Sequence, residues 1–181
     1  MLIGVFNKAI GSTTALRKTT KEFLSQKDLD LSSDQMELQI VYHERKPSLK
    51  NAPPYVSLSH SANIIACVVA ECQVGIDVEF MVERNFVELS KRYFSKTIAD
   101  NREFYEYWTA GEAMSKRTDV PLVKVLKSGF FAPFRHVPIF PNLIVTISTE
   151  RNFDENISVL DFYSNFSSNK SFTIYCPIEN A

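Results

Sequence analysis

The first 73 residues change from helical to strand spacing of their hydrophobic positions. Apolar residues among charges predict a short amphipathic helix over 19–29. Alternating apolar and polar residues predict a half-buried strand over 36–42. Three prolines and an asparagine within 46–54 predict a loop. Two further strands are predicted over 55–59 and 62–70, the second of them largely apolar.

The rest of the chain continues the mixture of helical and strand patterns. An apolar β-branched run predicts a strand over 74–79. Large apolar residues at helical spacing predict helices over 86–94 and 102–116. Further strands are predicted over 137–147, 157–163 and 172–175. We expect the C-terminal third, rich in Ser, Asn and Phe, to form sheet that packs on the 102–116 helix.

The composition is that of an ordinary globular protein. The 181 residues are 45% hydrophobic and 23% charged, which suits one domain or two small halves. A net charge of −1 gives no overall basic field for nucleic acid. No signal-like N-terminus is present, and the longest apolar run, Ile64 to Ala70, is too short to span a bilayer. Three cysteines without close spacing (Cys67, Cys72 and Cys176) favour a reducing cytoplasm.

The strand over 74–79 carries two carboxylates, Asp77 and Glu79, at positions i and i+2. Side chains at this spacing point to the same face of a strand. Two like charges held together are unfavourable unless a cation lies between them. The pair therefore suits Mg²⁺, which takes few protein oxygens and leaves room for phosphate oxygens. The alternative is a solvated strand face with no ligand.

Glu112 and Lys116 lie four residues apart on the 102–116 helix and so share a face with Phe104 and Trp108. A carboxylate beside this apolar row is expected to be partly desolvated. The pair is either a simple surface ion pair or part of a charged site.

His60 lies between Ser59 and Ser61, directly after an apolar strand. The hydroxyls and the turn backbone could form a concavity that binds phosphate, or the histidine could be structural. The Ser-His pair is not a hydrolase signature, because adjacent strand residues point oppositely and no Gly-x-Ser-x-Gly elbow is present.

Three blocks carry a family resemblance: 54–61 (PYVSLSHS), 74–79 (VGIDVE) and 108–116 (WTAGEAMSK). In this order they resemble the 4′-phosphopantetheinyl transferases, specifically the larger type that activates peptide and polyketide synthetases. The resemblance is clear from Lys46 to Lys116. It implies an α+β fold of two similar halves related by a pseudo-twofold, with the active site between them. The halves would be 1–73 and 74–181, and one chain would suffice as a monomer.

The resemblance also implies a chemistry. Asp77, Glu79 and Glu112 would hold Mg²⁺, and Glu112 would also take the proton of the incoming hydroxyl. Lys116 would stabilise the leaving diphosphate, while three further residues (Lys46, Ser59 and His60) would contact coenzyme A. The phosphopantetheine arm would pass to a serine of an apo carrier protein, releasing 3′,5′-ADP. Basic residues near the N-terminus (Arg17, Lys18 and Lys21) could reach the 3′-phosphate.

The sequence departs from the family at three places. Gly111 stands where the family has lysine before the helix glutamate, and Arg45 stands where it has glycine before Lys46-Pro47. The stretch before Lys46 is also short for the larger type. These departures motivate an alternative: a weakened or inactive relative that binds carrier protein or coenzyme A. A third possibility is an α+β domain in which the carboxylate pair is accidental.

Overall fold

The structure, a computed structural model, describes residues 1–27, 39–43, 46–50, 54–129, 133–150, 157–161 and 170–174. Within these ranges the chain has a mixed α+β architecture, with four α-helices and a short 3-10 helix, η1. The helices are η1 (Lys8–Ile10), α1 (Ser12–Ser25), α2 (Phe86–Tyr93), α3 (Asn101–Thr118) and α4 (Leu122–Ser128).

Ten strands form three sheets in the described part of the chain. The five-stranded sheet has the order β10-β9-β1-β5-β4 and the three-stranded sheet has the order β6-β8-β7, while β2 and β3 pair separately. The strands are β1 (Leu2–Asn7), β2 (Ile40–His43), β3 (Lys46–Leu49), β4 (Tyr55–Ser61), β5 (Ile64–Ala70), β6 (Val74–Phe80), β7 (Phe134–Phe140), β8 (Leu143–Thr149), β9 (Ile157–Asp161) and β10 (Lys170–Ile174).

The two larger sheets contain the same local topology. In the first, β1 leads to α1 and then to the hairpin β4-β5, whose second strand pairs antiparallel with β1. In the second, β6 leads through α2, α3 and α4 to the hairpin β7-β8, whose second strand pairs antiparallel with β6. Both units therefore have the spatial order first strand, third strand, second strand. β9 extends the first sheet by pairing parallel with β1.

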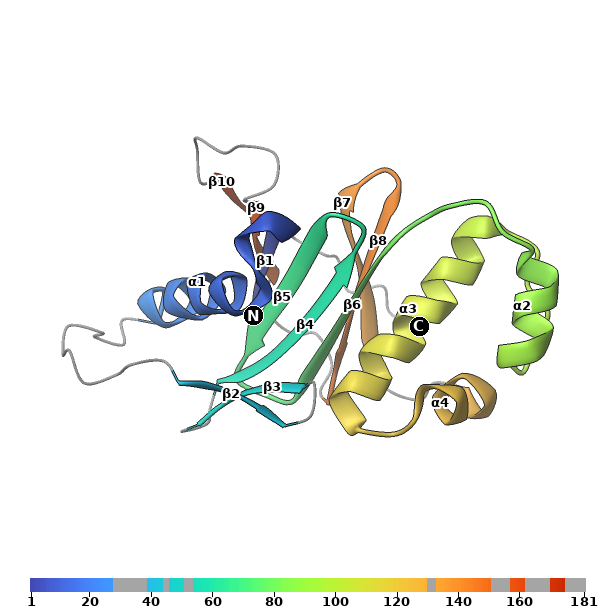
Figure 1. Ribbon diagram of the computed structural model, residues 1–181, viewed down its shortest axis with the longest axis horizontal. Helices are drawn as coiled ribbons and strands as arrows, with labels where there is room; N and C mark the ends of the chain where they lie inside the picture. The colour runs from blue at the N-terminus through green and yellow to red at the C-terminus, as the bar shows by residue number, and fades with distance from the viewer. Residues whose placement is uncertain are drawn as a thin grey trace.

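The elements form layers, with α1 on one side, α3 on the other and the strands between them (Figure 1). One apolar cluster lies between the two sheets and draws on β1, β5, β6, β7, β8 and β9. A second lies between α1 and the first sheet. A third joins α2, α3 and α4 to Ile144 of β8. Burying an apolar face of each helix and both faces of each sheet is what stabilises this arrangement.

Several predicted elements are confirmed with shifted ends. The first helix begins at Ser12 rather than at residue 19, and 137–147 is a hairpin rather than one strand. The loop expected at 46–54 was wrong for Lys46–Leu49, which form β3 because they pair with β2. Nothing in the hydrophobic pattern had indicated β1 or α4. Cys67 is fully buried on β5.

The C-terminal strands differ from expectation in their position. They were expected to pack on the Trp108 helix, and β7 and β8 do lie beside α3. β9 and β10 instead belong to the sheet of β1, since β9 pairs with β1 and β10 with β9. Cys176 and the outer ends of several predicted elements lie outside the described residues. No helix in the described ranges is long and apolar enough to cross a membrane.

Candidate functional site

Strands β4 and β6 lie side by side at the seam between the two larger sheets (Figure 1). Serine hydroxyls, rather than a backbone ladder, join them. Ser57 accepts a hydrogen bond from the backbone N–H of Ile76 (3.2 Å), and Ser61 accepts one from that of Phe80 (3.2 Å). The constant offset between partners shows that the two strands run parallel. A row of hydroxyls along β4 therefore faces β6.

Asp77 is the most enclosed carboxylate of the seam, with 4% of its surface exposed. Its Oδ1 accepts hydrogen bonds from the Ser59 hydroxyl (2.7 Å) and from the Lys116 ammonium (2.7 Å). Lys116 also donates to the Ser59 hydroxyl oxygen (2.8 Å), which closes a three-membered network. The other oxygen, Asp77 Oδ2, is buried and has no hydrogen-bond partner in the described part of the chain. Such a group is costly unless something binds it.

Helix α3 delivers Glu112 and Lys116 to this seam because it lies directly on β6. A Cβ atom at Gly75 would collide with the backbone carbonyl oxygen of Ala113, so only glycine allows this approach. The helix is fixed at its start by Asp100, whose carboxylate accepts from the Glu103 N–H (2.7 Å). Gly75, Asp77 and Glu79 alternate along β6 on the side that meets α3. The predicted sharing of one face by the two carboxylates fits this arrangement.

Glu79 and Glu112 complete a carboxylate cluster that we define as Asp77, Glu79 and Glu112. Burial raises the pKa of Glu79, and the Ser61 hydroxyl (2.7 Å from Oε2) lowers it in part. Burial also raises the pKa of Glu112, and the charges of Asp77 and Glu79 add to this, against the attraction of Lys116. These mutual effects place the three acids close together. The desolvation expected for Glu112 is confirmed.

The cluster partly fits a hard divalent cation. Its donors are carboxylate oxygens, which Mg²⁺ prefers, and the unpartnered Asp77 Oδ2 is available. However, no set of three His, Cys, Asp or Glu side chains among the described residues is arranged as a ready metal site. Lys116 occupies Asp77 Oδ1 instead. The carboxylate groups are suitable ligands for a cation. In this structure, however, the Lys116 ammonium pairs with Asp77 in place of a metal ion.

A pocket of about 600 Å³ opens beside the cluster. Lys116 and Lys46 both line it, which brings together two of the residues expected to contact coenzyme A and its leaving group. Lys46 is paired with Asp119 (2.7 and 2.8 Å), the residue that ends α3 in the left-handed conformation. A second pocket of about 320 Å³ lies across this ion pair and shares Lys46 and Asp119 with the first.

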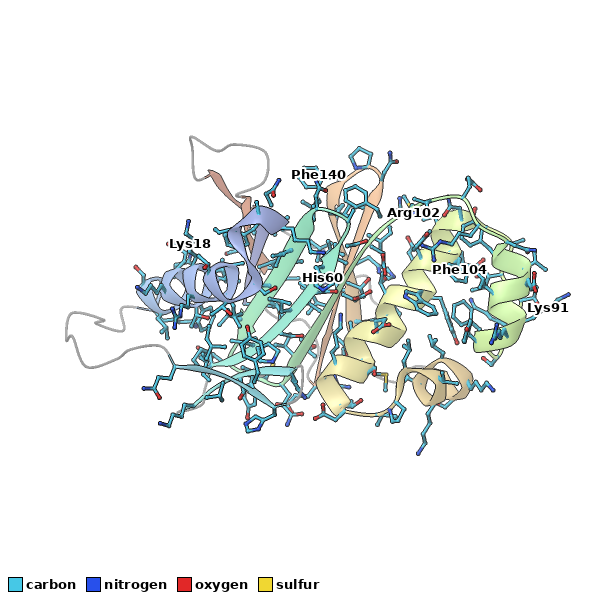
Figure 2. All side chains as sticks on the ribbon, viewed as in Figure 1. Lys18, His60, Lys91, Arg102, Phe104 and Phe140 are labelled. Carbon is cyan, nitrogen blue, oxygen red and sulfur yellow. The ribbon has the colours of Figure 1, made fainter. Side chains whose placement is uncertain are left out.

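His60 and Gly111 do not join the cluster. His60 is exposed, and its position between Ser59 and Ser61 on β4 turns it to the sheet face opposite the seam (Figure 2). Gly111 is buried in α3, five residues before Lys116 and therefore on a different face of the helix. The expected coenzyme A residues are thus split: Lys46 lines the pocket, Ser59 bonds Asp77 and Lys116, and His60 lies apart. Arg45 is outside the described residues.

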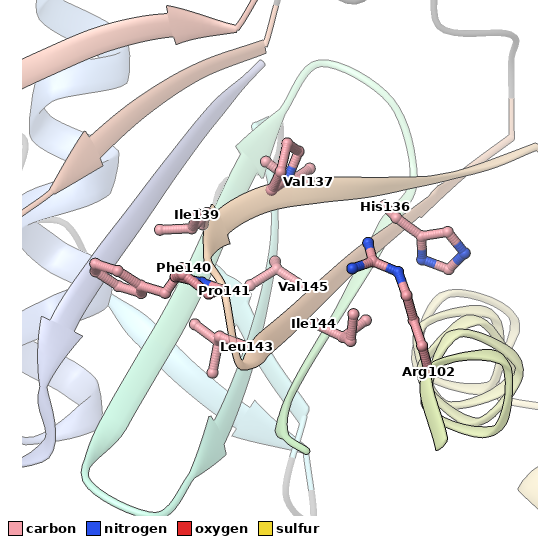
Figure 3. Close-up of a pocket in the computed structure, with 10 residues that line it drawn as sticks. Arg102, His136, Val137, Ile139, Phe140, Pro141, Leu143, Ile144 and Val145 are labelled. Carbon is pink, nitrogen blue, oxygen red and sulfur yellow. The ribbon is translucent and has the colours of Figure 1, made fainter. Parts of the chain in front are cut away.

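Two further polar features were not expected from the sequence. Ser61 binds Glu79 as Ser59 binds Asp77, an i, i+2 match to the carboxylates that could have been read from the sequence. One strand away from Asp77, Thr146 of β8 hydrogen-bonds Thr109 of α3 and His136 of β7. His136 and Arg102 border a pocket of about 410 Å³ that the β7-β8 hairpin otherwise lines with apolar residues (Figure 3).

No protein-family model matches the chain, and no curated protein matches it.

Proposed function

We propose that this protein transfers the 4′-phosphopantetheine arm of coenzyme A to a serine hydroxyl of an apo carrier protein, with Mg²⁺. The observation that carries the proposal is the group of charged side chains at the seam between β4 and β6. Three carboxylates, Asp77, Glu79 and Glu112, gather around one lysine beside a pocket lined by two lysines. This is the set that the family resemblance implies, brought together from β6 and α3. The repeated topology of the two units is consistent with the two-half fold of that family.

Asp77, Glu79 and Glu112 would hold the cation, which when bound offsets negative charge on the diphosphate. Lys116 and Lys46 are placed to bind phosphate oxygens in the pocket that they line. Glu112, whose pKa is raised by burial, would accept the proton of the serine hydroxyl, as the family resemblance implies. The serine oxygen then bonds to the β-phosphorus, and the bond from phosphorus to the oxygen of 3′,5′-ADP breaks. Lys116 stabilises the charge that this leaving group gains.

The proposal is tested by an intact-mass assay of apo carrier proteins incubated with the protein, coenzyme A and Mg²⁺. We expect a mass gain of one phosphopantetheine arm that a chelator abolishes. Asp77→Asn should reduce the rate by about 10³-fold or more, since it removes a charged ligand from the transition state. Glu106→Gln is the matched control, because Glu106 lies on α3 and pairs with Arg102 instead of joining the cluster. Full transfer by a folded Asp77→Asn protein would contradict the proposal.

A second candidate is a relative that binds coenzyme A or carrier protein without transfer. The ion pair between Lys116 and Asp77 favours it, because a lysine already neutralises the cluster. The buried Gly111 also removes the family's lysine from the helix. Calorimetry separates the two: coenzyme A binding with no mass gain on any carrier protein would support the binder. A chelator-sensitive mass gain would exclude it.

A further inference from the structure

The ammonium group of Lys116 lies where a cation would be needed to balance the carboxylate cluster. It is 2.7 Å from Asp77 Oδ1 and 2.8 Å from Ser59 Oγ. Its charge also lowers the pKa of both Glu79 and Glu112, so its field reaches all three acids. Arg84 is the other cation acting on Glu79, and no other basic side chain acts on Glu112 in the described part of the chain.

Lys116 also borders the 600 Å³ pocket, so its flexible side chain has two places to lie. About a third of the side chain is exposed (30%), whereas its partner Asp77 is enclosed (5%). The lysine can therefore leave the carboxylate without any backbone movement, while Asp77 cannot follow it. What remains after it leaves is a buried acid whose Oδ1 keeps the Ser59 hydrogen bond and whose Oδ2 has no hydrogen-bond partner in the described part of the chain.

We propose that Lys116 is a resident counter-cation that a divalent cation displaces, and that the displaced ammonium then binds a phosphate group in the adjacent pocket. The inference rests on the proposed function for the identity of the cluster as a Mg²⁺ site. It adds an order of events: the cation binds first, and the phosphate-binding lysine is released by that step. It also assigns Ser59 a positioning role, because its hydroxyl holds both Asp77 and the resting lysine.

Competition between Lys116 and a divalent cation for Asp77 should lower the apparent affinity of the protein for the cation, which can be measured. A ligand that binds only the state in which Lys116 has moved away has its affinity reduced by the fraction of that state. If the lysine rests on Asp77 about nine-tenths of the time, its removal tightens cation binding on the order of tenfold. The same removal deprives the pocket of a phosphate-binding charge. Cation affinity and phosphate affinity are therefore expected to change in opposite directions.

The test is calorimetric titration of Mn²⁺ and Mg²⁺ into the whole chain, without carrier protein, for the wild type and for Lys116→Met. We expect on the order of tenfold tighter cation binding in the variant, with weaker binding of 3′,5′-ADP in the presence of the cation. Lys116→Arg, which keeps a positive charge, should not tighten cation binding. Lys124→Met, at an exposed position on α4, is the matched control and should change neither. Unchanged or weaker cation binding in a folded Lys116→Met protein would overturn the proposal.

A wild-type measurement keeps the proposal testable should Lys116→Met fail to fold. Acetic anhydride acetylates free lysine amines, and peptide mass mapping reads each lysine separately. Adding Mn²⁺ should raise the acetylation rate of Lys116 several-fold and leave that of Lys124 unchanged. An unchanged rate at cation concentrations that saturate the site would overturn the displacement. Neither measurement uses transfer, so a protein can fail the mass assay above and still pass these, or the reverse.

Discussion

Helices α1 and α3 each lie closely on a sheet, but the polar groups at the two contacts form different kinds of hydrogen bonds. Each helix crosses its sheet at a glycine, Gly4 under α1 and Gly75 under α3. In the α1 layer the buried hydroxyls are satisfied locally: Thr19 and Thr20 donate to carbonyls of their own helix (3.0 and 2.8 Å). Adhesion to the sheet is then mainly apolar, with one side-chain hydrogen bond between Thr19 and Cys67 of β5.

In the α3 layer the polar groups cross from helix to sheet. Thr109 meets Thr146 of β8 (2.6 Å), Lys116 meets Asp77 of β6, and Arg117 donates to Ser148 of β8 (3.1 Å). Thr109 also donates to a carbonyl of its own helix, that of Tyr105, whereas Lys116 and Arg117 bond side chains of the strands. The first unit therefore contributes the edge strand β4 and an apolar core. The second unit contributes the charged side chains of the site, whose positions depend on how α3 packs on its sheet.

The largest expected effect, and the strongest test of this comparison, comes from adding a methyl group under each helix by replacing the glycine with alanine. Gly75→Ala would place its Cβ against the backbone of Ala113, which can move only if α3 moves. Gly4→Ala would meet side chains, those of Thr19 and Phe6. We expect Gly75→Ala to lower the free energy of unfolding by about 3 kcal/mol or more, and Gly4→Ala by about 1–3 kcal/mol. Chemical denaturation measures both.

The control for this pair is a rescue. Adding Thr19→Ala to Gly4→Ala removes the nearer obstacle and should restore part of the lost stability, whereas no side chain can be trimmed to relieve Gly75→Ala. Equal losses for the two glycine variants would mean that the α3 backbone yields as easily as the side chains under α1. The comparison would then fail.

Removing one buried hydroxyl from each helix-sheet contact should lower stability less than the added methyl groups do, and it tests the same comparison of α1 with α3. Thr146→Val keeps the side-chain shape but removes the hydroxyl that bonds Thr109 and His136 Nδ1 (2.7 Å). We expect a loss of about 1–3 kcal/mol, because His136 is left with an unpaired buried nitrogen. Thr20→Val removes a bond within α1 alone and should cost less than about 1 kcal/mol. Losses of the same size in the two layers would remove the distinction between local and crossing bonds.

The chain of hydroxyls also fixes the state of His136. Because Thr109 gives its proton to the carbonyl of Tyr105 (2.8 Å), it must accept from Thr146, which in turn accepts from His136 Nδ1. Burial lowers the pKa of His136, in keeping with a neutral ring. Its Nε2 is then left as an acceptor on the side of the pocket in Figure 3.

Local patterns predicted most of the elements but not their assembly. The i, i+2 spacing of Asp77 and Glu79 and the i, i+4 spacing of Glu112 and Lys116 were sufficient to place each pair on one face. That the two faces meet depends on Gly75, whose role is visible only once α3 lies on β6.

Pairing between distant segments was beyond the sequence pattern. β1 reads as a short apolar start to the chain, and only its partners β5 and β9 make it the centre of a sheet. The pairing of Lys46 with Asp119 joins residues 73 positions apart. The predicted strand ended at residue 59, so the sequence did not show that β4 continues through Ser61 and turns His60 away from the carboxylates.

The smallest expected effect is a gain in stability. The pKa of Glu112 is raised in the folded protein above its ordinary value of 4.5, so the folded state holds the proton more tightly than the unfolded chain does. The stability from that proton is present below 4.5 and is lost as the pH rises through the raised pKa. At neutral pH the charged Glu112 therefore weakens the fold. Glu112→Gln removes this penalty and should raise the midpoint of thermal unfolding by about 1–3 °C at neutral pH.

The gain should shrink as the pH falls through the raised pKa and should be absent below 4.5, because wild-type Glu112 is then protonated in both the folded and the unfolded state. Thermal melts across this range measure it, with Glu106→Gln as the control for loss of a half-buried glutamate of the same helix that pairs with Arg102. Mg²⁺ should reverse the order at neutral pH, since the wild type keeps three carboxylates for the cation and the variant keeps two. A variant that is less stable at neutral pH without Mg²⁺ would show that Glu112 serves the fold. Glu112 would then be a structural residue, like the locally satisfied hydroxyls of α1. It would not be a site residue whose charge lowers the stability of the fold.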